Sequence, residues 1–228
     1  MAATPSGAII SALNDPARPQ EDKDRDAQRH PADLMTFAGI KPGEKVADLL
    51  PGGGYFTRIF SRLVGPNGQV FAVSSTAGGK PLPEDPKYPN IKSMPQDFSQ
   101  LKFPVPLDLA WTSDNYHDLK NKKVEGGGDL AAATNRAVFE ALRPGGVYIV
   151  IDHAAASNAP EDVTSTLHRV NPSTVMKEVT AAGFKFESQS DVLANRADTH
   201  EAKVFDPSIR GKTDQFVFKF RKPGLPKP

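Results

Sequence analysis

The sequence predicts an α/β fold with a doubly wound, mostly parallel seven-stranded sheet and helices on both faces. Three observations support this fold class. Apolar segments of strand length alternate with amphipathic helical segments between residues 31 and 223. Turn signals such as GPNG and RPGG separate them. The last two strand segments have no helical pattern between them, which predicts an antiparallel hairpin at one edge of the sheet.

The first half of this region is expected to contain four strands and one helix. The run KVADLL at 45–50 is largely apolar, as is typical of a strand covered on both faces. Residues 55–64 predict a helix, because four apolar side chains recur on one face: Phe56, Ile59, Phe60 and Leu63. Further strands are expected at 69–75, 90–94 and 107–113.

The second half is expected to contain two helices and three strands. A helix over about 129–142 ends at the turn RPGG (143–146), and a strand apolar on both faces follows at 147–152. The next helix, 174–184, is stopped by Gly183. Two strands then complete the sheet, at 185–193 and at 214–222, where Phe216, Phe218 and Phe220 alternate.

Composition excludes several classes of function. The 228 residues include 28 Lys and Arg against 27 Asp and Glu, so no basic field favours nucleic acid or an anionic membrane. Apolar runs are too short to span a bilayer. The absence of cysteine excludes disulfides, thiolate metal sites and cysteine nucleophiles. We therefore expect a small-molecule substrate, with neither nucleic acid nor membrane as a partner.

The chain divides into three parts by composition. Residues 1–30 are charged and lack an apolar stripe, which predicts a polar N-terminal arm or a loosely docked helix. Residues 31–223 carry the apolar segments and are expected to form the folded domain. Residues 224–228 are a proline-rich tail, because proline cannot continue a strand.

Polar and titratable side chains gather after the predicted strands. Ligands of such sheets bind outside the carboxyl ends of the strands, where all these loops meet. The residues placed there are Asp48, Ser74, Asp97, Asp114, Tyr116, His117, Asp118, Asp152 and His153. The sequence therefore predicts a ligand site at this edge of the sheet.

The stretch VADLLPGGGYFT at 46–57 resembles the first motif of class I S-adenosylmethionine-dependent methyltransferases, an apolar run followed by acidic-x-Gly-x-Gly-x-Gly. Asp48, Gly52 and Gly54 match the motif, and Leu50 replaces its first glycine. GPNGQVFAVS, QDF and ALRPGGVYIVID look like later elements of that family, so the resemblance covers about residues 30–222. It implies a Rossmann-like fold and S-adenosylmethionine as cofactor, contacted by Asp48, Gly52, Gly53, Gly54, Tyr55, Ser74, Asp97, Phe98 and Asp114.

The sequence also departs from this family. At the end of the second strand the family has Asp or Glu, which accepts hydrogen bonds from the ribose hydroxyls, whereas this chain has Ser74. Leu50 adds bulk to the glycine turn. Two functions therefore stand open: a small-molecule methyltransferase, or a protein of the same fold that binds another small ligand or catalyses a different reaction through its histidines.

A narrower resemblance concerns the compartment. The stretches NYHDL, IDHAA, LHRV and GKTDQFVFKFRKP are similar to a group of predicted bacterial methyltransferases, many of which carry an export signal. The start MAATPSGAII itself lacks a basic n-region and a full apolar core. The resemblance implies a periplasmic mature form, with the cytoplasm as the alternative.

Four side chains near the strand ends are candidates for catalysis: His117, Tyr116, His153 and His168. We expect His117 or His153 to take the acceptor's proton, with Asp114 and Asp118 orienting His117. The alternative is that these histidines are hydrogen-bonded loop residues. Histidines and carboxylates together are also able to hold a divalent metal, but no His-x-His or His-x-x-x-His spacing occurs, and we assign no metal ligand.

Overall fold

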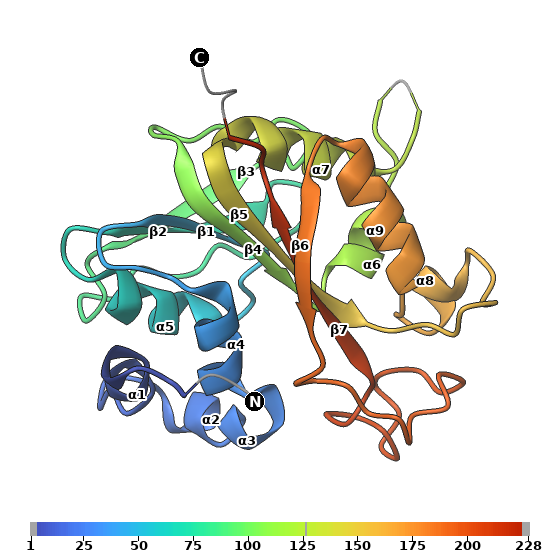
Figure 1. Ribbon diagram of the computed structural model, residues 1–228, viewed down its shortest axis with the longest axis horizontal. Coiled ribbons are helices and arrows are strands. Elements are labelled where there is room, and N and C mark those ends of the chain that lie inside the picture. Colours follow the sequence, from blue (N-terminus) through green and yellow to red (C-terminus); the bar gives the residue numbers. More distant parts are fainter. Residues whose placement is uncertain (1–3, 126, 225–228) are drawn as a thin grey trace.

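A computed structural model describes residues 4–125 and 127–224 (Figure 1). Its centre is one seven-stranded sheet with the order β3-β2-β1-β4-β5-β7-β6. The strands are β1 (Lys45–Leu49), β2 (Gln69–Ser75), β3 (Ile91–Gln96), β4 (Leu107–Ser113), β5 (Leu142–His153), β6 (Lys185–Ser190) and β7 (Gln215–Arg221). The pairs among β1 to β5 are parallel, whereas β7 is antiparallel to both β5 and β6. The predicted fold class and its edge hairpin are confirmed.

The helices are α1 (Gly7–Leu13), α2 (Gln20–Lys23), α3 (Asp26–Arg29), α4 (Pro31–Ala38), α5 (Tyr55–Val64), α6 (Tyr116–Lys120), α7 (Leu130–Ala141), α8 (Val163–Thr166) and α9 (Pro172–Ala181). Helix α5 has the bounds expected from its apolar face, and α7 begins after Asp129, whose side chain accepts the hydrogen bond of the Ala132 N–H. None of the helices in the described ranges is long and apolar enough to cross a membrane.

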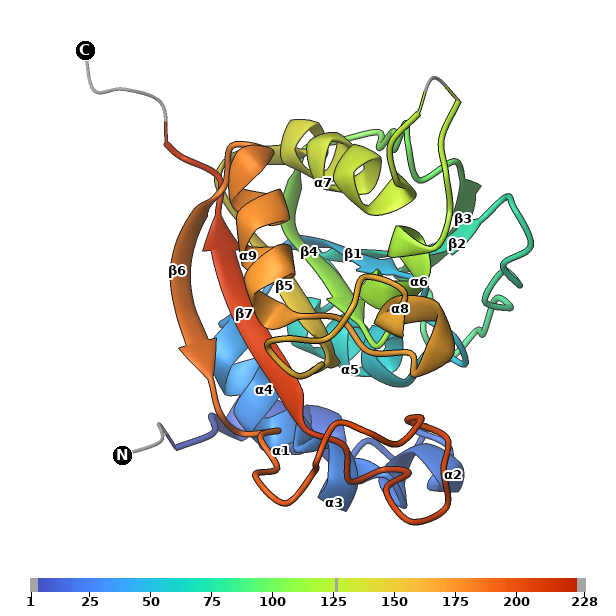
Figure 2. The same cartoon turned by 90° about the vertical axis from the view of Figure 1, so that its right-hand side faces the viewer.

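Each face of the sheet carries its own hydrophobic core. Along β1, Val46 belongs to the cluster that includes α4 and α5, and Ala47 belongs to the cluster that includes α6, α7 and α9. Neighbouring residues of β7 divide in the same way, with Val217 in the first cluster and Phe218 in the second. Because successive strand side chains point to opposite faces and both faces are covered, the central strands are largely apolar, with polar residues such as Asp48 and Asp152 near their carboxyl ends. Figures 1 and 2 show the helices on the two sides.

The segment expected to be a polar arm or a loosely docked helix forms three short helices, α1 to α3, that pack onto the domain. Ile9 and Ala12 of α1 lie in the same core cluster as α5. The charges of the segment are largely paired: Arg18 with Asp26 at 2.7 Å, and Asp22 with Arg58 of α5 at 2.7 Å. The many charged residues of this segment predicted a solvated surface. In the folded chain these side chains instead form ion pairs with one another and with α5. Of the predicted tail, residues 225–228 lie outside the described residues.

Element ends differ from expectation where turns occur inside strands. β5 begins at Leu142, so the RPGG turn lies within the strand, at the point where its register with β4 shifts. β3 continues to Gln96, and β6 ends at Ser190. The segment 191–214 then runs beside α3 (Figures 1 and 2), so closely that a Cβ added at Gly211 would lie 2.9 Å from the side chain of Gln28. This segment helps to enclose the site described next.

Candidate functional site

The loops after β1 and β2 enclose a cavity of about 1100 Å³, which we call the cradle cavity. Its walls are the glycine loop (50–53), the end of β2 (74–75), the segment 77–86 and one side of α6. The parallel register of β1 with β2 brings the two strand ends together. The sequence predicts no role for residues 77–86, because Gly and Pro there indicate a loop without indicating what it covers.

The glycine loop exposes backbone to this cavity. A Cβ added at Gly52 or Gly53 would meet no atom within 4 Å, so open space lies beside both residues. At Gly54 an added Cβ would come 2.8 Å from Leu82, so this glycine is required for packing of the loop. Leu50 has a φ of 57°, a left-handed conformation that costs a side chain about 1–2 kcal/mol. It stands where the methyltransferase motif has its first glycine.

Ser74 is the polar group that the cradle cavity leaves unsatisfied. It is 2 % exposed, and its Oγ has no hydrogen-bond partner among the described residues. A buried hydroxyl without a partner costs about 1–3 kcal/mol. A ligand hydroxyl in the cavity would remove this cost, and the position of Ser74 in the cavity wall fits the ribose position implied by the motif.

Asp48, Tyr55 and Asp114 do not line the cradle cavity. They line a smaller cavity of about 180 Å³ behind the glycine loop. The Asp48 carboxyl accepts a hydrogen bond from Thr57 Oγ1 at 2.6 Å, and complete burial raises its pKa to about 7. The Tyr55 hydroxyl donates to Asp26 at 2.6 Å. These contacts bond β1 to α5, and α5 to α3.

The residues expected to contact adenine lie elsewhere. Asp97 is exposed, and its carboxylate accepts the N–H of Ser99 at 2.8 Å in a local turn. Phe98 is 1 % exposed and belongs to the hydrophobic core. Neither residue lines the cradle cavity. The contact of Asp97 and Phe98 with the cofactor stays a prediction, since the structure places both residues outside the cradle cavity.

A second cavity, of about 1120 Å³, lies beyond the end of β4, and we call it the histidine chamber. Its lining includes Asp114, His117, Asp118 and His153, together with Arg29 from α3. Asp118 also lines the cradle cavity, so the two cavities meet at this residue. The arrangement can hold two ligands side by side.

His117 is oriented by a residue for which the sequence predicts no such contact. Its Nδ1 lies 2.8 Å from Asp152 Oδ1, and Asp152 Oδ2 accepts the backbone N–H of His117. Burial alone would lower the pKa of His117, but the charge and hydrogen bond of Asp152 outweigh it and raise this pKa. Asp118 faces Nε2 at 3.6 Å, and Asp114 makes no hydrogen bond to the ring. The expected orienting pair is therefore corrected to Asp152, which comes from the end of β5.

His153 and His168 differ in what their rings can do. His153 Nδ1 lies 2.8 Å from Thr213 Oγ1 and 3.0 Å from Gln215 Nε2, and burial lowers its pKa. Its Nδ1 lone pair is already used as an acceptor. His168 packs edge-on against His117, with 5.4 Å between ring centroids. His117 presents its Nε2 to the chamber, and the His168 ring lies beside it.

Tyr116 is a structural residue and not a catalytic one. It is completely buried and lines neither large cavity. Its hydroxyl donates to Glu178 Oε2 at 2.8 Å and accepts from Asn135 Nδ2 at 2.8 Å. The sequence placed Tyr116 at the correct edge, but α6 turns its side chain into the core between α7 and α9.

Arg29 was not predicted as a site residue, because it belongs to the segment expected to be an arm. Its Nη2 lies 3.2 Å from Asp114 Oδ2, and its guanidinium lies 4.9 Å from the centre of the Tyr55 ring. Asp114 has a φ of 60° and also accepts a hydrogen bond from Gln215 at 3.0 Å. No motif marks Arg29 in the sequence, since its partners come from distant parts of the chain.

Similarity searches relate the chain to methyltransferases. No family model matches. The ubiquinone/menaquinone biosynthesis C-methyltransferase UbiE of Saccharophagus degradans is 28% identical over 192 residues, which are 81% of this chain and 67% of that protein. The protein of the same name from Pasteurella multocida is 31% identical over 121 residues, 50% of this chain and 42% of its own length. Most of these curated relatives are matched over about half their length or less.

Solved structures share the fold at low identity. A SAM-dependent methyltransferase from Aquifex aeolicus has a TM-score of 0.57 at 16% identity, covering 95% of this chain and 98% of that one. The arsenic methyltransferase CrArsM of Chlamydomonas reinhardtii has a TM-score of 0.59 at 17% identity, covering 98% of this chain and 75% of that one. The [4+2]-cyclase SpnF has a TM-score of 0.61 at 13% identity, covering 95% of this chain and 93% of that one. With the glycine loop and the seven-stranded sheet, the chain has the fold of S-adenosylmethionine-dependent methyltransferases, and its sequence is similar to that of the UbiE methyltransferases.

Proposed function

We propose that the protein transfers a methyl group from S-adenosylmethionine, bound in the cradle cavity, to a small molecule bound in the histidine chamber. The observation that carries this proposal is the junction of the two cavities at Asp118. Methyl transfer by in-line displacement mainly requires that donor and acceptor be held next to each other. Two adjoining cavities that end at the same carboxylate supply this arrangement.

The cradle cavity fits the cofactor at two points. Backbone of Gly52 and Gly53 faces open space, and the Ser74 hydroxyl is buried without a partner among the described residues. S-adenosylmethionine, when bound, supplies an activated methyl group. Ser74 would bind a ribose hydroxyl, and Asp48 would bond β1 to α5, the two elements that the glycine loop connects, through Thr57. The neutral serine gives one hydrogen bond where a carboxylate would give a stronger, charge-assisted pair.

The histidine chamber fits a small organic acceptor. Its volume is comparable to that of small-molecule sites, which range over about 300–1000 Å³. Arg29, Asp114 and Gln215 bring polar groups into it, and His117 brings the lone pair of Nε2. An acceptor oxygen or nitrogen must lose a proton to become a nucleophile, and His117 stands where this activation would occur.

Calorimetry with S-adenosylmethionine and its demethylated product tests the cofactor site. We expect Ser74→Asp to bind S-adenosylmethionine about tenfold more tightly, which corresponds to about 1.4 kcal/mol. Ser165→Asp in α8 is the control, because it adds the same charge at an exposed residue that lines neither large cavity. Equal tightening in Ser165→Asp and Ser74→Asp, or no binding by either the wild type or Ser74→Asp, would overturn the cofactor assignment.

Gly53→Val provides the complementary loss of binding. Gly53 does not have a left-handed φ and its Cβ would face open space, so the variant should fold normally while its side chain occupies the cavity. Gly7→Val on α1 is the control, since Gly7 also faces open space and lies far from the loop in sequence. Equal affinity in Gly53→Val and the wild type would return the glycines to a purely structural role.

A second function is favoured by Leu50 and Ser74, the two departures from the motif. The fold is shared by SpnF, a protein named for a cyclisation, so the fold by itself does not fix the chemistry. In this alternative the cradle cavity holds another small ligand and the histidines act on it. Absence of S-adenosylmethionine binding in the folded wild type, with a retained cavity, would favour this alternative.

A further inference from the structure

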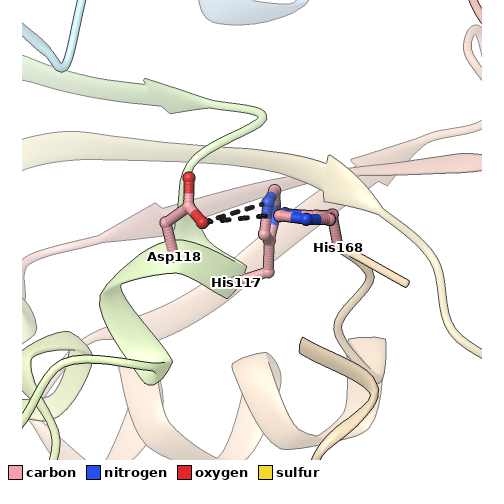
Figure 3. Close-up of side chains that lie close together, drawn as sticks. All are labelled: His117, Asp118 and His168. Atoms are coloured by element: carbon pink, nitrogen blue, oxygen red, sulfur yellow. Dashed lines mark ion pairs between the residues drawn. The ribbon is translucent and has the colours of Figure 1, made fainter. Parts of the chain in front are cut away.

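Three potential metal ligands converge at the border of the histidine chamber, which two of them, His117 and Asp118, line. Asp118 Oδ1 lies 3.6 Å from His117 Nε2 and 3.9 Å from His168 Nδ1 (Figure 3). All three ligand atoms lie within 4.8 Å of one another. Two ligand atoms bound to the same tetrahedral zinc ion are about 3.4 Å apart, given bonds of about 2.0–2.1 Å. The two distances from Asp118 Oδ1 therefore need to shorten by only a few tenths of an ångström for these atoms to bind one ion.

The far side of His117 has the support that metal-bound imidazoles show. Nδ1 is bonded to Asp152, which is completely buried and also accepts the backbone N–H groups of His117 and His153. In metal sites, a ligating histidine almost always gives its other nitrogen to a carboxylate, carbonyl or water, which fixes the ring and its tautomer. Asp152 leaves Nε2 of His117 with its lone pair directed toward Asp118.

The position of His168 is also fixed by its surroundings. His168 has a φ of 56°, a left-handed conformation that is costly for a residue with a side chain. The next residue, Arg169, is completely buried and bonds to Asp198 and to the carbonyl of Ala154. This anchor holds the loop after α8 against the end of β5, and the His168 ring, with 33% of its side chain exposed, packs edge-on against His117.

We propose that His117, Asp118 and His168 bind one divalent first-row transition-metal ion of the zinc type. Two imidazoles and one carboxylate suit Zn²⁺, Fe²⁺ and Mn²⁺ better than Mg²⁺ or Ca²⁺, which prefer oxygen ligands. Three protein ligands leave at least one position open, as in catalytic metal sites. An ion on Nε2 would occupy the lone pair of His117, so in the metal-bound protein the ion would polarise the acceptor oxygen in place of His117 acting as a base.

The other cluster of this kind is less suited to a metal. Asp114, Asp152 and His153 also lie within 4.8 Å of one another, but their atoms already have partners. Asp114 is paired with Arg29 and Gln215, and His153 Nδ1 lies between Thr213 and Gln215. Sequence spacing did not reveal the first cluster, because two of its ligands are adjacent on α6 and the third comes from a distant loop.

Metal binding is measured directly, independently of any methyl transfer. Tag-free protein is stripped with a chelator, and Zn²⁺ is titrated by calorimetry with metal analysis after dialysis. We expect one tightly bound Zn²⁺ per chain in the wild type. Loss of a residue that only supports a metal ligand weakens metal binding by up to about 100-fold. His168→Asn removes a ligand itself, so it should weaken Zn²⁺ binding by more than this. Asparagine tolerates the left-handed backbone of this position.

His30→Asn is the matched control. His30 also has a left-handed φ, of 44°, and its Nδ1 lies 3.8 Å from Asp33, but no second histidine in the described ranges is paired with this aspartate. This variant should bind Zn²⁺ as the wild type does. The proposal is overturned if the stripped wild type binds no Zn²⁺ at micromolar concentration, or if His30→Asn and His168→Asn lose affinity equally. S-adenosylmethionine affinity, measured on the same proteins, reports the cofactor site separately.

Discussion

Asp48 shows how one buried carboxyl makes stability depend on pH. Burial raises its pKa from 3.8 to about 7 in the folded protein, although Thr57 and the charge of Arg29 oppose the shift. Between about pH 4 and pH 7 the folded protein therefore holds a proton that the unfolded chain has released. The free energy of unfolding should fall as the pH rises through this window and level off above about pH 7.

Asp48→Asn should remove this contribution, because the amide is neutral at every pH and its oxygen still accepts the Thr57 hydrogen bond. A shift of about three pKa units corresponds to about 4 kcal/mol. We expect the variant to exceed the wild type in stability by up to this amount at pH 8, and by little at pH 4. Urea denaturation of both proteins at the two pH values measures the difference. A difference that does not change with pH would contradict the assignment.

Among the elements, α5 connects the N-terminal helices to the cradle cavity through Arg58. Its Nε donates to Asp22 of α2 at 2.8 Å, and its Nη2 donates to the carbonyl of Gly53 at 2.7 Å. Asp22 is only 4 % exposed. The same guanidinium therefore holds α2 in place and fixes the backbone of the glycine loop.

Arg58→Met should cost about 3–5 kcal/mol, because it leaves the Asp22 carboxylate buried without its partner. The double variant Arg58→Met/Asp22→Asn should recover part of the loss, and urea denaturation of all four proteins gives the coupling energy. Arg143→Met is the matched control, since the Arg143 side chain is 49% exposed and its pair with Asp108 should contribute less than about 1 kcal/mol. Equal losses from the two single arginine variants would contradict this explanation.

Across the molecule as a whole, the single tryptophan reports on the joint folding of the sheet and the N-terminal helices. Trp111 of β4 is completely buried, and its ring centre lies 4.9 Å from that of Phe56 and 5.3 Å from that of Phe60. Ile9 and Ala12 of α1 belong to the same core cluster. Removal of the N-terminal helices would therefore expose the core that surrounds the indole.

We expect the urea transitions followed by Trp111 emission and by far-ultraviolet circular dichroism to coincide, as they do in cooperative unfolding. Because the N-terminal helices share a core with α5, they should not unfold first. A helical signal that is lost at lower urea than the Trp111 shift would show that residues 4–30 unfold independently, as the sequence alone suggested. A variant such as Arg58→Met should move both transitions together.

Local patterns in the sequence are enough to predict most elements and the class of the fold. The helix over 55–64 and the strands over 69–75 and 107–113 were predicted with the bounds that α5, β2 and β4 have. The glycine loop after β1 was predicted in place as well. These features depend on hydrophobic periodicity and on turn-forming residues, and both are determined by residues that lie close together in the sequence. The packed N-terminal helices were not predicted, because their charges are paired across the fold with residues such as Arg58 and not along the chain.

The role of each side chain at the strand ends depends on the tertiary structure. Folding sets Asp152 against His117, brings His168 to Asp118, and turns Tyr116 away into the core. It also leaves Ser74 in the cavity wall without a partner among the described residues. Such contacts depend on strand register and on how distant loops pack, which no local pattern in one sequence encodes. The edge of the sheet could be read from the sequence, whereas the partners at that edge exist only once the chain has folded.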